Sequence, residues 1–515
     1  MAINPTSAPG LYIVELPSNA HTIQAAPKSI AVFVGYTHPF KTKRFDHAIE
    51  VDSFTDYERQ FGGLYASGII DAHVAYAINQ FFLNGGIKSW VIGLEPKYYD
   101  NTNNSLGKVK DSAPTTTIGQ IIFTGREMTD LVPMRVTIDN VVAGKADITI
   151  TYGSSIETYR KVSLVSTDAT YIEKVIGTQT KPASGLVTVK PNGANYGAFA
   201  AASNQALTIT PPLTWATTFS ASDFNGVFQA DSSLDKDVDI FNLLLVPGVT
   251  DFGVCSDALA FAERKKAFVI LDPPVQAASD DSGGLTPMQD LVDANLVPKS
   301  TNGAIYFPYL RTIDPVTASP IELPPSGFVA GKIAETDQVG PWIAPAGLGT
   351  IIGTTTGVVT RGKLTDARLG NLNFRGVNCL RSLPGIGTVI WGARTLVAEN
   401  TAFEQWKYVP IRRMALFIEQ SLLMSLTWAV FQPNDDPLYL ALRNTVGNFM
   451  LSLFNAGAFE GSTPSQAFRV VCDRTTTTDD DRAGGVCNIL VAFRPLKPAE
   501  FVVIKIAQLA GQAAA

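Results

Sequence analysis

Residues 240–274 carry two short and almost wholly apolar runs on either side of a helical stretch. The first run is IFNLLLVPG at 240–248 and the second is AFVILDPP at 267–274, with ALAFAERKK at 258–266 between them. A strand that is apolar on both faces must be covered on both sides, which is typical of parallel sheets in α/β proteins. The pattern therefore predicts a parallel α/β sheet, to which GAIYFPYL at 303–310 adds a further strand.

Elements of the same kind occur near the start of the chain. IAVFVG at 30–35 predicts a buried strand, and a helix at 71–83 followed at once by a strand at 89–94 gives a helix-to-strand step. Ser53 is suited to cap a short helix, because Asp56 lies three residues further on, where its side chain reaches back to the cap. These elements are expected to belong to the same α/β core.

The composition changes between residues 97 and 236. Thr, Ser, Asn and Gly become frequent, and short alternating runs appear, such as MRVTIDNV and ADITITY. Alternation with a period of two is typical of half-buried strands. We therefore expect an inserted, mainly β domain.

The last part of the chain returns to helices and then to strands. Apolar spacing predicts long helices at 411–431 and 438–454, followed by strands at 468–472, 488–493 and 501–506. In the second helix a core-facing stripe is expected from Leu438, Leu442, Val446, Phe449 and Leu453.

Charge and composition exclude several classes of partner. Hydrophobic residues make up 46% and charged residues 17% of the chain, which argues against disorder and indicates large buried interfaces. The net charge of -6 gives no basic excess, so no nucleic acid partner is expected. The first residues have no basic start and no apolar run, so no secretory signal and a cytoplasmic site of synthesis are expected. The apolar window 414–431 is too short to span a membrane, so no membrane insertion is expected.

The sequence gives no sign of a cofactor, a metal site or an enzyme. The four cysteines are dispersed without a C-x-x-C pair, which favours reduced structural thiols over a zinc site or a disulfide framework. Gly331-Lys332 and Gly362-Lys363 lack the rest of a phosphate-binding loop. All four histidines lie in the first 73 residues, and none has a nucleophile arrangement nearby. The acidic run 479–481 is open to two interpretations, a cation ligand or a solvated loop, and its Thr and Gly neighbours favour the loop.

The block GVNCLRSLPGIGTVIWGARTLVAENTAFEQWKYVPIRR at 376–413 resembles the signature of contractile tail sheath proteins. Shorter segments of the chain resemble the same family: PGLYIVEL at 9–16, FFLNGG at 81–86, PPSGFVAGKIAETD at 324–337, GPWIAPAG at 340–347 and KPAEFVVIKIAQ at 497–508. The signature positions are Asn378, Leu380, Arg381, Pro384, Gly385, Gly387, residues 391–396, Trp406, Tyr408, Arg412 and Arg413. The block itself offers no nucleophile, base or phosphate cradle, and it predicts a turn, a buried strand and the entry to a core helix.

The resemblance implies a multidomain α/β (α+β) fold. Its core is subtilisin-like in shape, its C-terminal α/β domain is completed by the N-terminal segment, and its mainly β insertion faces outward. The implied parts are an N-terminal exchange arm (1–20), a first part of the core (21–96), the inserted outer domain (97–236), the remaining core (237–375), an inner sheath domain (376–494) and a C-terminal exchange arm (495–515).

Two strands near the chain ends are apolar on both faces and stand beside Pro-flanked segments. They are formed by Leu11, Tyr12, Ile13, Val14, Glu15 and Leu16, and by Phe501, Val502, Val503, Ile504, Lys505 and Ile506. Such strands expose unpaired N–H and C=O groups unless something covers them. From their pattern alone, pairing within the subunit and pairing with a neighbour stay open. The resemblance implies the second, in which each subunit's arms extend a small sheet of the next.

Four arginines of the block are open to the same two alternatives, contacts within the subunit and contacts with a neighbour. Arg381, Arg394, Arg412 and Arg413 could bridge subunits, since arginine suits bidentate carboxylate pairing at interfaces. Internal pairs that fix the domain are the alternative.

The resemblance also implies function and partners. The chain is expected to polymerise as a helical tube around an inner tube and to contract, which drives the inner tube through a target cell envelope. The implied partners are other copies of the chain, the inner tube protein, and baseplate and tail terminator proteins. Assembly is expected in a bacterial host cytoplasm, and the product would be a phage tail or an injection particle. Contact with the inner tube is expected from helix 438–454 and the loop at 460–465. The alternatives are a hydrolase with a subtilisin-like fold and a non-contractile filament or shell protein.

Overall fold

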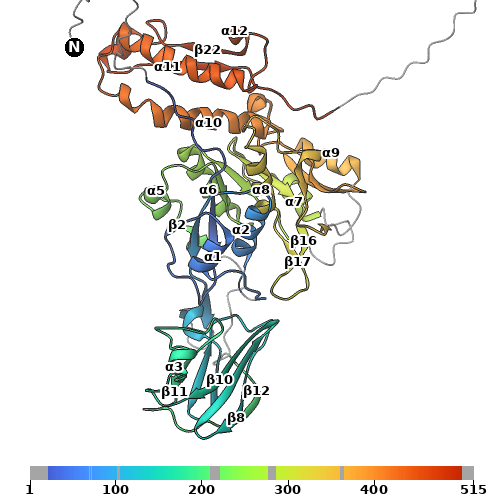
Figure 1. Ribbon diagram of the computed structural model, residues 1–515. Helices are drawn as coiled ribbons and strands as arrows, with labels where there is room; N and C mark the ends of the chain where they lie inside the picture. The colour runs from blue at the N-terminus through green and yellow to red at the C-terminus, as the bar shows by residue number, and fades with distance from the viewer. Residues whose placement is uncertain are drawn as a thin grey trace, which may run out of the picture. The chain divides into compact units, whose positions relative to one another are not determined.

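The computed structural model describes residues 21–68, 70, 72–100, 105–208, 221–275, 286–359 and 365–501 (Figure 1). The chain divides into two compact units. The larger takes its described residues from Pro27–Phe417 and Lys497–Ala515, and the smaller from Met1–Ala26 and Ile418–Leu496.

A nine-stranded sheet forms the centre of the larger unit, in the order β18-β21-β20-β15-β14-β13-β1-β3-β2. The six strands from β3 to β20 in this order are parallel, and the strands at both edges are antiparallel. The parallel sheet predicted from residues 240–274 is therefore confirmed. The strands are β1 (Ala31–Tyr36), β2 (Ala48–Val51), β3 (Ser89–Leu94), β13 (Leu243–Leu245), β14 (Phe268–Leu271), β15 (Gly303–Phe307), β18 (Ile351–Ile352), β20 (Val377–Leu383) and β21 (Gly387–Ile390).

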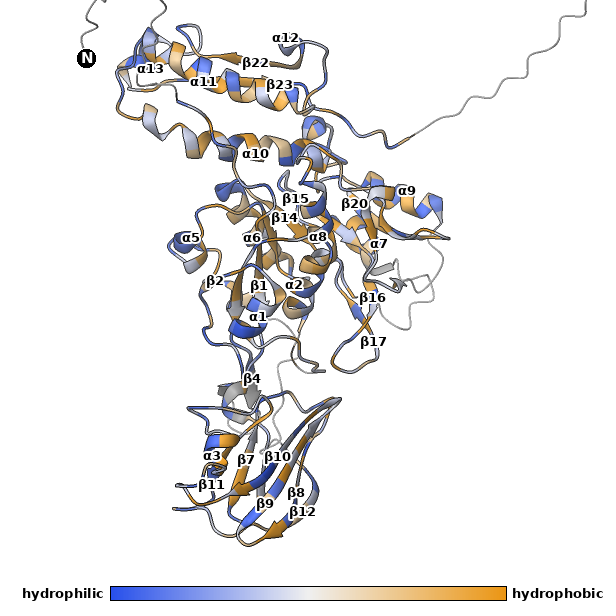
Figure 2. Ribbon diagram, in the orientation of Figure 1, coloured by the Kyte–Doolittle hydropathy of each residue, from blue (hydrophilic) through white to orange (hydrophobic). Residues whose placement is uncertain are grey.

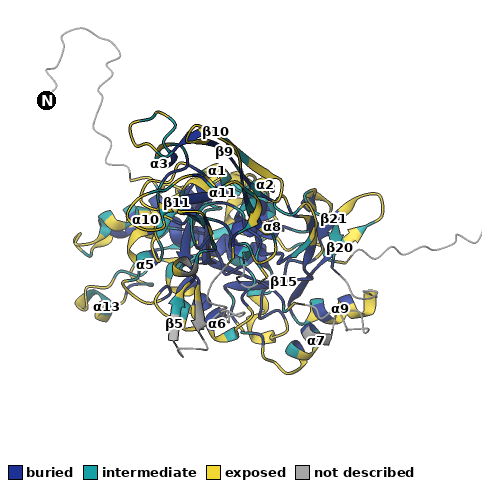
Figure 3. Cartoon of the chain, turned by 90° about the horizontal axis from the view of Figure 1, so that it is seen from below, coloured by how far each residue is buried: buried dark blue, intermediate teal, exposed yellow. Residues whose placement is uncertain are grey.

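Both faces of the central sheet are buried. In β13, Leu244 belongs to one apolar cluster, whereas Leu243 and Leu245 belong to another. The sheet strands are accordingly coloured as hydrophobic in Figure 2 and as buried in Figure 3. This explains why β13 and β14 are apolar at every position rather than at alternate ones.

Helices pack against this sheet. Helix α6 (Phe252–Lys265) connects β13 to β14, and α2 (His73–Leu83) packs on α8 (Ser326–Thr336). The short helix α1 (Phe54–Phe61) begins as predicted, because the Ser53 side chain accepts a hydrogen bond from the Asp56 amide. Other helices of this unit are α4 (Ala221–Phe224), α5 (Ser233–Asp237), α7 (Thr286–Asp293) and α9 (Asp366–Phe374).

The inserted stretch is mainly β, as its alternation predicts. It holds a four-stranded sheet, β10-β9-β8-β12, and a three-stranded sheet, β11-β7-β6, around a cluster of their buried apolar side chains. Residues 221–238 belong instead to the apolar core of the central sheet, through Phe224, Leu234 and Val238. The insertion therefore ends earlier than the predicted boundary at 236. Its elements are β4 (Lys97–Asp100), β5 (Ser105–Lys108), β6 (Thr115–Ile118), β7 (Ile121–Gly125), β8 (Met134–Val142), β9 (Lys145–Tyr152), β10 (Ser155–Ser163), α3 (Ile172–Val175), β11 (Val187–Pro191) and β12 (Ala202–Ala206).

The smaller unit is built on a long helix and a β-hairpin. Helix α11 (Asp436–Asn455) buries the predicted stripe, and β22 (Phe468–Val471) pairs antiparallel with β23 (Leu490–Phe493). The preceding helix α10 (Val409–Ser425) crosses from the larger unit into the smaller one. It ends before the predicted residue 431, because a short 3-10 turn (Thr427–Ala429) and Phe431 at φ 66° break the helical course.

The strands β20 and β21 belong to the central sheet, and the two compact units divide at Ile418. One further prediction differs from the structure. The acidic run 479–481 begins a short helix, α13 (Asp479–Ala483), whose capping box joins Thr478 and Asp481, rather than a loop. Within the described ranges, no three His, Cys, Asp or Glu side chains are grouped to hold a metal, and no helix has the length and apolar character to cross a membrane.

Candidate assembly site

The signature block lies in the middle of the larger unit. It supplies β20 and β21, the segment that follows them and the start of α10. The predicted turn and strand are confirmed, since β20 and β21 form a hairpin around Gly385, whose φ is 74°. Gly376 opens the block at φ 86°, and a Cβ there would lie 2.6 Å from the Thr395 carbonyl oxygen. Glycine is therefore required where β20 begins beside residue 395.

Asn378 connects the two halves of the block. This residue is fully buried on β20. Its amide group donates hydrogen bonds to the carbonyls of Ile305 (3.2 Å) and Arg394 (2.8 Å), and its side-chain oxygen accepts one from the Arg394 amide (2.7 Å). Asn378 thereby fixes the backbone of Arg394 against the central sheet at β15.

Arg394 in turn holds Glu500, which lies at the start of the C-terminal segment. Nε and Nη2 of Arg394 donate to the two carboxylate oxygens over 2.9 and 2.5 Å, and Nη1 donates to the Asn373 carbonyl over 3.0 Å. Tyr408 adds a hydrogen bond of 3.3 Å to the same carboxylate. The two charged side chains are only 6% and 15% exposed, so the carboxylate is held in a mostly water-free setting.

The other three arginines of the block also have partners inside the chain. Arg413 forms a bidentate pair with the buried Asp337. Arg412 donates to Asn302 over 2.9 Å and stacks on Trp406. These contacts support the internal alternative for Arg394, Arg412 and Arg413.

Arg381 is partly exposed, as is Arg412, whereas Arg394 and Arg413 are buried. The side chain of Arg381 is 31% exposed, and its 3.3 Å ion pair is to Asp366, whose side chain is 89% exposed. It also lies near the half-exposed ring of Trp391. The interface alternative for Arg381 therefore stays a prediction.

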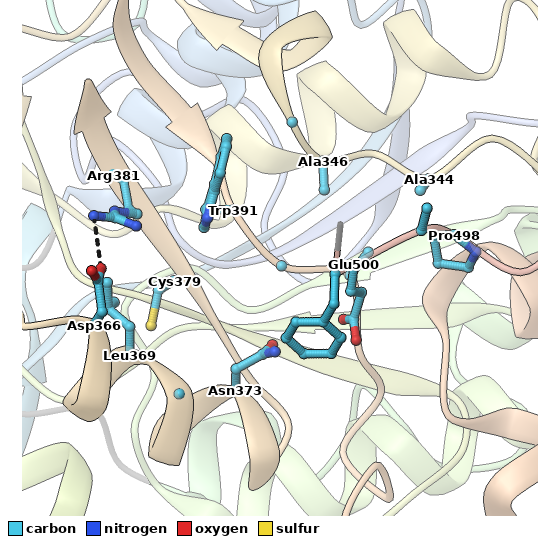
Figure 4. Close-up of a pocket in the computed structure, with 16 residues that line it drawn as sticks. Ala344, Ala346, Asp366, Leu369, Asn373, Cys379, Arg381, Trp391, Pro498 and Glu500 are labelled. Atoms are coloured by element: carbon cyan, nitrogen blue, oxygen red, sulfur yellow. Dashed lines mark ion pairs between the residues drawn. The ribbon is translucent and has the colours of Figure 1, made fainter. Parts of the chain in front are cut away.

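A cavity of about 350 Å³ lies where these residues meet the C-terminal segment. Arg381 and Asp366 form an ion pair on one side of it, and Pro498 and Glu500 line another side (Figure 4). Phe501 also lines the cavity and is 76% exposed. The last described residue, Phe501, therefore lies beside this cavity and directly follows Glu500, which Arg394 holds.

The N-terminal segment is held in a different way, within the smaller unit. His21 stacks on Trp428 with ring centroids 3.8 Å apart, and the amides of Gln24 and Ala26 donate to the hydroxyls of Ser425 and Ser421. Each chain end is thus attached to one unit before it enters the residues outside the described structure.

The predicted exchange strands fall almost entirely on those residues. Leu11, Tyr12, Ile13, Val14, Glu15 and Leu16, and likewise Val502, Val503, Ile504, Lys505 and Ile506, lie outside the described residues, whereas Phe501 lies at their edge. The pairing of these strands therefore stays a prediction.

A small sheet in the smaller unit is suited to accept such strands. Among the described residues it contains β22 and β23 alone. A two-stranded hairpin is marginally stable by itself and leaves an unpaired edge on each side. Leu490 of β23 is 56% exposed, which adds apolar surface at this hairpin.

One buried polar cluster was not anticipated from the sequence. Asp272, at the end of β14, accepts hydrogen bonds from the Ser326 hydroxyl (2.6 Å), the Ser326 amide (2.8 Å) and the Gly248 amide (3.0 Å). Burial raises the pKa of Asp272 to about 6. The Ser326 hydroxyl is fully buried and donates to a carboxylate, so this cluster does not present a serine nucleophile to a substrate.

Sequence reasoning also missed Glu500, although the chain carries a signal for it. Glu500 is the only acidic residue after Asp481, and it stands immediately before the apolar run that begins at Phe501. A lone carboxylate at the start of an apolar strand indicates a specific partner. Its partner could not be identified, because Arg394 is 106 residues away in the sequence.

No family model and no curated protein matches the sequence. Solved structures do match the fold. The helical sheath of the anti-feeding prophage in its contracted state is 20% identical, with a TM-score of 0.57 over 98% of this chain and 99% of that one. The PVC sheath complex of an extracellular contractile injection system, also contracted, gives the same identity and TM-score over 98% of both chains. The sheath tail protein from Desulfitobacterium hafniense is 12% identical, with a TM-score of 0.55 over 90% of this chain and 94% of that one. Together with the signature at 376–413, these matches show that the chain has the fold of the contractile sheath proteins.

Proposed function

We propose that this chain is the structural subunit of a contractile sheath, which polymerises as a helical tube around an inner tube and contracts to drive that tube through a target cell envelope. One observation carries the proposal. The fold is shared with sheath chains over nearly the whole length of both molecules, so the similarity is not confined to one widespread domain. The shape of the core, a parallel sheet buried on both faces, is consistent with the subtilisin-like form that the sequence resemblance implies.

The assembly mechanism that we propose is exchange of the terminal strands. Residues 11–16 and 501–506 would add to the open edges of the β22–β23 sheet in neighbouring copies. Main-chain hydrogen bonds would supply the link, and the apolar side chains would fix the register. A head-to-tail contact of this kind need not close, so it generates a helical tube.

Contraction then needs no catalytic residue. Each subunit keeps its arms in its neighbours while the units repack into a shorter and wider arrangement with more favourable contacts. Interface gains of a few kcal/mol per subunit, summed over the tube, would supply the work.

The remaining partners follow from the same proposal. The inner tube protein would contact the smaller unit, for which α11 and the loop at 460–465 are candidates. Baseplate and tail terminator proteins would contact the two ends of the sheath. Assembly would take place in a bacterial host cytoplasm, as part of a phage tail or an injection particle, with the insertion on the outer surface.

Expression of the full chain alone, followed by negative-stain electron microscopy and sedimentation, tests the proposal. Long hollow tubes are expected, because sheath subunits carry all the contacts needed for their own polymer. A protein that stays monomeric at high concentration would contradict it. If the tubes keep their diameter when a denaturant is added and when they are heated, a non-contractile filament is favoured.

A further inference from the structure

We propose that the ion pair between Arg394 and Glu500 is the anchor that transmits the pull of the C-terminal arm to the central sheet of its own subunit. This inference rests on the proposed function, because it assumes that the arm engages a neighbouring subunit. It assigns a mechanical role to the signature block, for which no chemical role was found.

The position of Glu500 is the first step. The predicted exchange strand begins at Phe501, the next residue, so no residue lies between the strand and Glu500. Any force along the arm therefore reaches the Glu500 backbone first. Resistance there depends on how firmly the Glu500 side chain is held.

The carboxylate is held by charge-assisted hydrogen bonds in a protected setting. Arg394 reaches both of its oxygens, and Tyr408 contacts one of them. Such bonds are about twice as strong as neutral ones. By contrast, the bidentate pair of Arg474 and Asp436 is more than 60% exposed on both sides.

Arg394 must itself be immobile for the anchor to bear a load. Its backbone N–H and C=O are both bonded to the Asn378 side chain, which also bonds Ile305 on β15. Residues 393–395 further pair with the segment 407–409 through backbone hydrogen bonds. A pull on Glu500 is thereby spread over β15, β20 and the entry of α10.

This path connects four separate stretches of the sheath-like sequence. Asn378 lies in the N-x-L-R part of the block, Arg394 in W-G-A-R-T-L and Tyr408 in the W-x-Y part, whereas Glu500 lies in the distant K-P-A-E-F run. The fold brings all four to one place. The block therefore holds the start of the C-terminal segment through side-chain hydrogen bonds to Glu500.

The test compares matched neutral variants in the full chain. Glu500→Gln and Arg394→Gln remove one member each of the anchor, and the double variant removes both charges. Glu127→Gln breaks another buried ion pair of the same unit, that with Lys41, at a place outside the path from Glu500, and serves as the control for loss of stability alone. Thermal melting first establishes that each variant is folded at the assay temperature.

Two measurements follow. The critical concentration for tube formation, from pelleting, is expected to rise about tenfold or more in Glu500→Gln and Arg394→Gln, the factor typical of one lost charged hydrogen bond. The double variant should be no worse than Arg394→Gln, and folded Glu127→Gln should assemble as the unchanged chain does. Chymotryptic cleavage at the exposed Phe501 in the unassembled protein should also become about tenfold faster in the two anchor variants alone, because the protease needs the residues beside Phe501 to be released from the structure.

The cleavage measurement keeps the two proposals distinguishable. If the unchanged protein forms no tubes, the sheath proposal fails, yet faster cleavage at Phe501 in Glu500→Gln would still support the anchor. Unchanged cleavage, or tubes that form at the original concentration in both anchor variants, would overturn the anchor whether or not the chain is a sheath.

Discussion

The guanidinium group of Arg413 holds the carboxylate of Asp337 through two hydrogen bonds, of 2.7 and 2.5 Å, with both side chains at most 4% exposed. Arg413 also donates to the Lys28 carbonyl over 3.1 Å. The pair thus connects the start of α10 to the end of α8 and to the segment before β1. Within the larger unit, it fixes the end of the signature block to elements from the first part of the core.

Asp337→Asn is expected to destabilise the protein by about 3–5 kcal/mol, because it leaves Arg413 as an uncompensated buried charge. Urea unfolding followed by tryptophan fluorescence, at a concentration below assembly, measures the change. Asp436→Asn is the matched control, since it breaks the exposed bidentate pair with Arg474 and should leave the unfolding midpoint within experimental error. Equal effects of the two variants would contradict the assigned difference in burial.

A pH dependence is expected from Asp272. Burial raises its pKa to about 6 in the folded protein from 3.8, so the folded state binds a proton more tightly than the unfolded state does. The stability that this proton contributes is complete below pH 3.8 and is lost as the pH rises through about 6. A shift of about two pKa units corresponds to about 3 kcal/mol.

The Asp272→Asn variant isolates this contribution, because asparagine does not titrate. Its free energy of unfolding, relative to that of the unchanged protein, should rise between about pH 4 and pH 6 and stay level above that range. Parallel urea titrations at four or five pH values measure the difference. A difference that is constant over this range would show that Asp272 is not the group with the raised pKa.

The sequence predicts strands and helices that are specified by nearby residues, but not contacts between distant segments. The runs at 240–248 and 267–274 specify parallel strands by themselves, because every position of the strands Leu243–Leu245 and Phe268–Leu271 is apolar and both faces must be covered. The capped helix after Ser53 was equally predictable, since its signals lie within ten residues. Contacts between distant segments were not predictable in this way.

Arg394 and Arg413 illustrate the limit. The sequence places both in a recognisable block and leaves their partners open, because Glu500 and Asp337 are 106 and 76 residues away. Pairing of β20 with β15 places the start of the block in the central sheet, and the motif itself does not specify this contact.

Cys472 and Cys487 are expected to form a disulfide when an oxidant is supplied. Their sulfur atoms are 3.9 Å apart beside the β22–β23 hairpin. Burial raises the pKa of Cys472 to about 12, so few thiolates are present and the reaction should be slow. Each bond formed releases two protons and passes two electrons to the oxidant.

Diamide treatment followed by peptide mass spectrometry checks this expectation. The linked peptide should contain Cys472 and Cys487, and the melting temperature should rise, because the bond closes a loop of about 15 residues. Cys487→Ser is the control and should show no linked peptide. A bond that joins two chains, or one that involves Cys255 or Cys379, would contradict the geometry.

Deletion of residues 501–515 is expected to leave a folded subunit that cannot polymerise. The deletion removes the predicted strand 501–506 and keeps Glu500, so the anchor to Arg394 is retained while nothing remains to extend the sheet of a neighbour. Deletion of residues 1–16 should have the same effect through the other arm. A chain that lacks only residues 507–515 is the matched control, and it should still form tubes because the predicted strand is intact. Sedimentation and negative-stain microscopy separate these outcomes, with thermal melting to show that each shortened chain is folded. Normal tubes from either of the two longer deletions would rule out strand exchange as the link between subunits, since no chain could then supply the missing strand.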